Sequence, residues 1–166
     1  MVFDGTLILC GAIAASGAIT GQACNGAGNI ISTNTVDLGP PGLGGAPGQL
    51  GDMGQGEPVI VDFHVRTAPT VGTSCEFQLI QADDAALTSG VQVLVSTGPV
   101  PIANLPAGRH VYLSVPPTGR YLPKRYFGAR VVNVGVIATH TVFACLVQDG
   151  QSQLDQTLFR TGYSVA

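Results

Sequence analysis

Glycine occupies every third position from residue 39 to residue 54, and Pro40, Pro41 and Pro47 fall within the same stretch. Both residue types disfavour a helix, and proline cannot donate the hydrogen bond that a central strand requires. The stretch is therefore predicted to be extended or irregular backbone. Its period also meets the requirement of a collagen-like triple helix, although the strict repeat stops at Glu57. Under either interpretation, we expect an extended arm.

A strand pattern begins directly after this arm. Val59, Val61, Phe63 and Val65 alternate with other residues, as in a strand with one buried face. A second alternating stretch, 75–80, follows a turn at 70–74, so the two are expected to form a hairpin. Further strands are predicted at these ranges: 2–9, 30–38, 91–96, 111–115, 126–134 and 141–147.

Glycine and proline turns separate these short strands, and no amphipathic helix of useful length is present. We therefore predict an all-β, single-domain, jelly-roll-like sandwich of about eight strands. The expected core residues are Val61, Phe63, Phe77, Leu79 and Leu146. The expected parts are an N-terminal arm with first strands (1–38), the Gly/Pro-rich arm (39–56), the sandwich core (57–149) and a C-terminal arm (150–166).

Charged side chains make up only 10% of the 166 residues, and the net charge is −3. So few charges indicate a surface that neighbouring molecules largely cover. The negative balance gives no support for nucleic-acid binding. The apolar N-terminus is broken by Gly11 and Gly17 and carries Asp4 where a signal peptide needs a basic residue, so we expect neither export nor a membrane partner.

The motifs of known reaction centres are missing from the sequence. The four cysteines lack Cys-x-x-Cys spacing and the three histidines stand apart, so zinc is disfavoured and the cysteines are expected to be buried thiols. A Cys10–Cys24 disulfide has no further support. His64 is interpreted as a solvent-face or interface residue, and Asp84 as the N-cap of a helical turn. We expect no enzyme activity, cofactor or metal.

One basic and aromatic cluster stands out as a candidate interface: Arg120, Lys124, Arg125, Tyr126 and Arg130. Arginine and tyrosine are favoured interface anchors, so contact with an acidic protein surface or between subunits is one interpretation. The alternative is an internal ion pair of Arg125 with an acid such as Asp37 or Asp62.

Several short elements, in order along the chain, resemble the jelly-roll decoration (cement) proteins of tailed bacteriophages. They are Asp4 with Leu7, Ala18-Ile19-Thr20, Ser32 to Gly39, Gly56-Glu57-Pro58, Ala86-Leu87-Thr88, Leu105 with Ala107-Gly108, and Arg125 to Gly128. The chain departs from that family at residues 25–31, in the triplet arm and in the C-terminal extension.

The resemblance implies a homotrimer, made in the host cytoplasm, on the outer surface of the virion capsid. There it would bridge neighbouring major capsid subunits, its partners being the major capsid protein and its own copies. One alternative is another head structural protein, such as a fibre base or completion protein. A second is a secreted carbohydrate-binding β-sandwich, which the absence of tryptophan disfavours.

Overall fold

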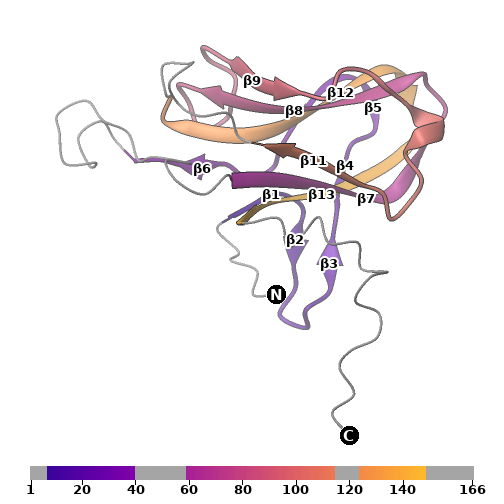
Figure 1. Ribbon diagram of the computed structural model, residues 1–166, viewed down its shortest axis with the longest axis horizontal. Helices are drawn as coiled ribbons and strands as arrows, with labels where there is room; N and C mark the ends of the chain where they lie inside the picture. The colour runs from indigo at the N-terminus through magenta and orange to yellow at the C-terminus, as the bar shows by residue number, and fades with distance from the viewer. Residues whose placement is uncertain (1–6, 40–58, 115–123, 149–166) are drawn as a thin grey trace, which may run out of the picture.

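The computed structural model describes residues 7–39, 59–114 and 124–148, which form two antiparallel sheets packed face to face (Figure 1). One sheet has the order β1-β13-β7-β11, and β4 also pairs with β13. Its strands are β1 (Ile8–Cys10), β4 (Gln22–Ala23), β7 (Val59–Thr70), β11 (His110–Ser114) and β13 (Thr139–Gln148). The predicted all-β sandwich is confirmed.

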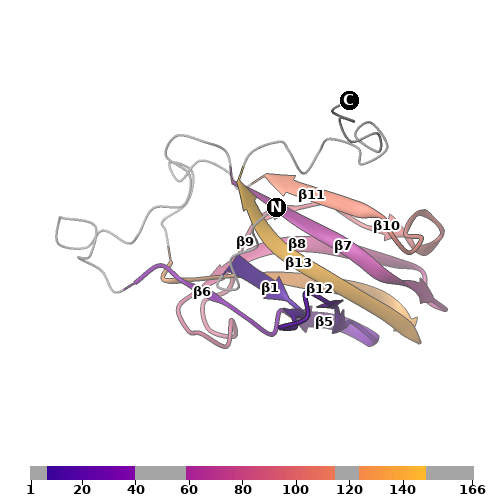
Figure 2. The same ribbon diagram turned by 90° about the horizontal axis from the view of Figure 1, so that it is seen from below.

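The second sheet has the order β10-β8-β12-β5, with β9 also on β8 and β6 also on β12. Its strands are β5 (Gly26–Ile31), β6 (Val36–Asp37), β8 (Ser74–Ala82), β9 (Gln92–Ser96), β10 (Val100–Pro101) and β12 (Tyr126–Ile137). A short hairpin of β2 (Ala12–Ile13) and β3 (Ile19–Thr20) projects beyond the first sheet (Figure 1). Figure 2 shows the first sheet from that side, with β1, β13, β7 and β11 in order. A 3₁₀ helix, η2 (Ile102–Asn104), follows β10.

The core lies between the sheets and is built from the apolar residues that alternate along the strands in the sequence. Val61, Phe63 and Val65 of β7 face Phe77 and Leu79 of β8, and all five are fully buried. The rings of Phe63 and Phe77 lie 5.2 Å apart between their centroids. Leu146 of β13 is also buried. The five predicted core residues are therefore confirmed.

Smaller clusters cover parts of the outer faces. Ile8, Phe143 and Cys145 are buried beneath Ile13 and Ile19 of the β2–β3 hairpin. On the other sheet, Leu87 of the β8–β9 connection packs on Ile80 and Ala82. These coverings explain why β13 and β8 are buried on both faces, which a simple alternating pattern does not predict.

The predicted hairpin around the turn at 70–74 is wrong. β7 pairs with β13 and β11, whereas β8 pairs with β12, β9 and β10, so the turn carries the chain from one sheet to the other. The β12–β13 connection, a single residue after Ile137, carries the chain back from the second sheet to the first. Alternation identifies the buried face of a strand and not its partner, which is why the pattern misassigned the pairing.

The N-terminal segment also differs from expectation. The single strand expected at 30–38 is two strands, β5 and β6, and both pair with β12. Leu9 and Cys24 are fully buried in the core, so β1 and the segment around β4 pack into the sandwich. Residues 1–6, the triplet arm from residue 40 and the C-terminal segment lie outside the described residues.

Asp84 begins a single turn, in which the Leu87 N–H donates to the Asp84 carbonyl at 3.0 Å, but it is not the N-cap of a helix. Its carboxylate accepts hydrogen bonds from the backbone N–H groups of Thr88 and Ser89 at 2.9 and 2.7 Å. Leu87 has a φ of 55°, which ends any helical path. In the described part of the chain, no helix is long and apolar enough to cross a membrane.

Candidate functional site

The basic cluster lies where β12 begins, at the end of the sandwich that also holds Asp37 and Asp83. Arg125 donates two hydrogen bonds to the Asp37 carboxylate, both at 2.8 Å, and its guanidinium lies 5.0 Å from the Tyr126 ring centroid. This bidentate pair lowers the pKa of Asp37 to about 2. The internal ion pair considered from the sequence is thus confirmed, with Asp37 as the partner.

The other members of the cluster also have partners within the chain. Lys124 pairs with Asp83 at 2.8 Å, and Arg130 Nε donates to the Gln78 side-chain oxygen at 2.7 Å. Arg120 lies outside the described residues. The structure therefore brings together Lys124, Arg125 and Tyr126 at one end, where Asp83 and Asp37 pair with the two basic side chains. An interface role for them remains a proposal.

A ladder of three rings lies on the outer face of the β7–β11 pair. The register places His110 beside His64 and Tyr112 beside Asp62. The ring centroids of His64 and His110 are 4.3 Å apart and those of His110 and Tyr112 are 5.9 Å apart, with interplanar angles of 9° and 15°. The Asp62 carboxylate hydrogen-bonds the His110 ring at Nδ1, at 2.9 Å.

Burial shapes the electrostatics of this ladder. It raises the pKa of Asp62, against the opposing effect of the hydrogen bond from His110. Burial, reinforced by His110 and Arg66, lowers the pKa of His64 to about 4, so this ring is neutral at pH 7. The His110 ring is held in place by its Nδ1 hydrogen bond to the Asp62 carboxylate.

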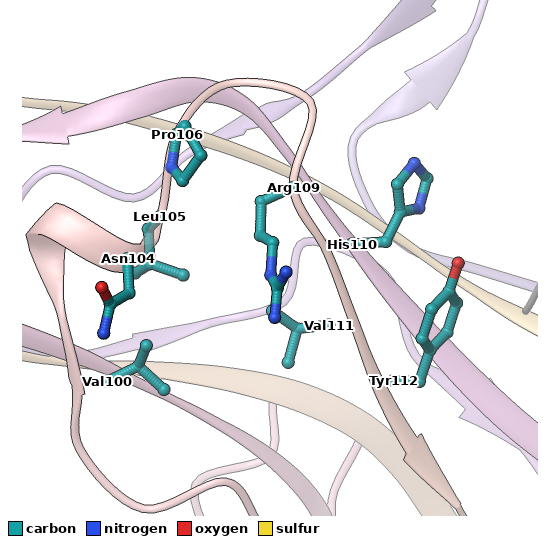
Figure 3. Close-up of a pocket in the computed structure, with 8 residues that line it drawn as sticks. All are labelled: Val100, Asn104, Leu105, Pro106, Arg109, His110, Val111 and Tyr112. Carbon is teal, nitrogen blue, oxygen red and sulfur yellow. The ribbon is translucent and has the colours of Figure 1, made fainter. Parts of the chain in front are cut away.

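A groove of about 680 Å³ borders β11, between the edges of the two sheets (Figure 3). Val100, Leu105, Pro106 and Val111 form apolar walls. The Arg109 side chain extends into the groove between Asn104 and Val111, whereas His110 and Tyr112 project to the other side of the strand (Figure 3). In the described part of the chain, Arg109 belongs to none of the ion pairs, and its guanidinium has the geometry to bind a carboxylate.

The four cysteines are free and buried. Burial raises the pKa of Cys24 and Cys145 to about 12 and that of Cys75 to about 11, so these thiols are neutral. His140 is fully buried beside Cys75, with 3.8 Å between its Nδ1 and the sulfur. No group of three or more His, Cys, Asp or Glu side chains within the described ranges could hold a metal ion.

Sequence reasoning missed the ladder and the groove. The sequence signal for the ladder was the alternation of residues on two strands. Asp62 and His64 share one face of β7, and His110 and Tyr112 share one face of β11. However, the two strands are more than 40 residues apart in the sequence, and no local pattern gives their register. The ladder therefore becomes visible only once the strands pair.

The described residues form a β-sandwich, and charged side chains make up only 10% of the full sequence. Comparison with protein-family models identifies the family: residues 14–146 match the model of Bbp16, and the chain belongs to this family of bacteriophage proteins. The match covers β7, β8 and β12 in full and β13 as far as Leu146. No match was found among curated proteins.

Proposed function

We propose that this chain is a structural virion protein that decorates the outer capsid surface of a tailed phage. It binds the major capsid protein and stabilises the mature head by bridging neighbouring capsid subunits. The observation that carries this proposal is membership of a phage protein family over most of the chain. The low charge content supports it, because a surface that neighbours cover needs few charges to stay soluble.

The physical basis of stabilisation is mass action. A protein that binds only the expanded lattice lowers the free energy of that lattice relative to the immature or broken one. Following the resemblance to decoration proteins, the proposal includes a homotrimer. Three linked copies turn a weak contact with each capsid subunit into a tight attachment.

The test uses heads of the parent phage assembled without this chain. Purified chain added back should bind mature heads at many sites on the outer surface, as seen by cryo-electron microscopy. It should also raise the temperature at which the heads release DNA. A few copies at a single vertex would instead indicate a completion protein or fibre base. Absence of the chain from purified virions by mass spectrometry would overturn the proposal.

A further inference from the structure

Three valines are strongly exposed at one end of the sandwich. Val71 of the β7–β8 turn is 67% exposed, and Val134 and Val136 at the end of β12 are 48% and 65% exposed. The other large apolar side chains exposed in the described part of the chain are at 36%. We call these three residues the valine tip.

The backbone of Val71 is strained. Its φ is 62°, in the left-handed region that a β-branched residue rarely adopts and that glycine or asparagine adopts more readily. Leu87 is the other non-glycine residue with positive φ in the described ranges, and its side chain is fully buried, which offsets the strain. Val71 gains no such burial. The fold therefore provides no reason for valine at this position.

The tip is held in a fixed shape by the two connections that form it. The Thr73 N–H donates to the Val134 carbonyl at 2.9 Å, and the Ala138 N–H donates to the Thr70 carbonyl at 2.8 Å. A Cβ added to Gly135 would lie 3.2 Å from the Gly72 Cα, so the two glycines pack closely. A rigid apolar knob loses little conformational entropy when it docks.

The tip is also free of charge. Residues 67–75 and 131–141, which build this end of β7, β8, β12 and β13, contain no Asp, Glu, Lys or Arg. The ion pairs of Asp37 and Asp83 lie at the opposite end of the second sheet, because Tyr126 pairs with Ala82 there and Val134 pairs with Ser74 at the tip. The matching partner surface is therefore neutral and apolar.

From these observations we infer that the valine tip docks into an apolar depression on the protein shell that the chain decorates, an inference that rests on the function proposed above. Three partly exposed valines offer far less area than the roughly 1,200 Å² that a stable interface buries, so tip-to-tip contact cannot hold two copies together. On a shell, the same small contact is repeated over many copies and adds to others. A membrane is disfavoured because the tip lacks basic and aromatic anchors.

The decisive variant is Val71→Asn. It relieves the strained backbone, so the melting temperature should stay unchanged or rise, while affinity for heads made without the chain should fall at least about tenfold. Val136→Thr, nearly the same shape with a hydroxyl, should act in the same direction. Val91→Thr alters an exposed valine away from the tip and should bind like the parent chain.

Each other outcome overturns the inference. If the parent chain binds heads and Val71→Asn binds equally well, the tip is not the docking surface, and the proposed decoration role stands. If Val71→Asn changes the oligomeric state, the tip belongs to contacts between copies. If the parent chain, but not Val71→Asn, floats with phosphatidylcholine vesicles, the partner is a membrane. If the parent chain fails to bind heads, the proposed function fails as well.

Discussion

His140 is a titratable side chain enclosed in an apolar core. Among the described residues its Nε2 has no hydrogen-bond partner, and its ring lies edge-on to Phe77 with 6.3 Å between centroids. Burial lowers the pKa of His140 to about 4. His64, on the outer face of the same sheet, also has a pKa lowered to about 4, mainly by burial. The folded chain thus keeps both rings neutral where an unfolded chain would protonate them.

Because the pKa values of His64 and His140 are lowered in the folded chain, we predict that acid lowers the free energy of unfolding. The unfolded chain binds both protons below a pKa of 6.5, whereas the folded chain binds them only near pH 4. Their contribution to stability is therefore fully present above about pH 6.5 and is lost as the pH falls toward 4. Burial raises the pKa of Asp62, which opposes this trend in acid.

The variant His140→Leu should reduce the pH dependence, because it removes one of the two titrating groups. Its backbone contacts remain available, since the N–H at position 140 donates to the Asn25 side-chain oxygen and the carbonyl accepts from Cys24. Melting temperatures measured from pH 7.5 to 4 should fall less steeply than those of the parent chain. Identical slopes would show that His140 is already protonated or accessible in the folded state.

Phe63 provides a direct measure of the core. Its ring is fully buried against Phe77 between the sheets. Phe63→Ala should lower the free energy of unfolding by about 3–5 kcal/mol, through lost burial and the cavity that remains. Urea denaturation gives this value, with Val91→Ala, at an exposed position, as the control. A loss below about 1 kcal/mol would mean that Phe63 does not occupy the core.

At the scale of elements, the sequence predicted strands better than their partners. The alternation of Val61, Phe63 and Val65 fixes a buried face, and the structure confirms it. The partner of β7 is decided by long-range contacts with β13 and β11, which no local pattern encodes. The β7–β8 pairing failed for this reason, and the ladder of His64, His110 and Tyr112 was missed for the same one. The Arg125–Asp37 pair could be anticipated because few acids are available to it.

Two deletions separate the roles of the N-terminal strands and the triplet arm. Removing Pro40 to Gln55 should leave the sandwich folded, because β6 and β7 on either side are held by β12 and β13 respectively. Removing residues 1–13 deletes β1 and the fully buried Leu9, and should lower the melting temperature markedly. Circular dichroism melting curves compare the two.

The same arm deletion tests where the partner binds. If the arm contacts the capsid or a sister copy, the shortened chain should decorate heads poorly or fail to form the trimer. Native mass spectrometry and head binding measure these two properties. A shortened chain that binds and assembles like the parent would show that the arm is only a loop.

The whole molecule has two unlike ends. One carries the matched ion pairs of Arg125 with Asp37 and of Lys124 with Asp83, and the other carries the uncharged valine tip. Neither end presents a strong field in the described part of the chain. The net charge of −3 over 166 residues gives the molecule little long-range attraction for any charged partner.

This distribution predicts that attachment to heads depends little on salt. Contacts made by apolar surface are not screened, whereas attraction between exposed charges weakens as the Debye length shrinks from about 10 Å at 0.1 M to about 3 Å at 1 M salt. The dissociation constant for heads should therefore change by less than about threefold between these concentrations. Sedimentation of heads with labelled chain across a sodium chloride series measures it, and Val71→Asn serves as the weak-binding comparison. A steep loss of affinity with salt would contradict the prediction and indicate a contact made by basic side chains that have no ion pair among the described residues, such as Arg109 in the groove beside β11.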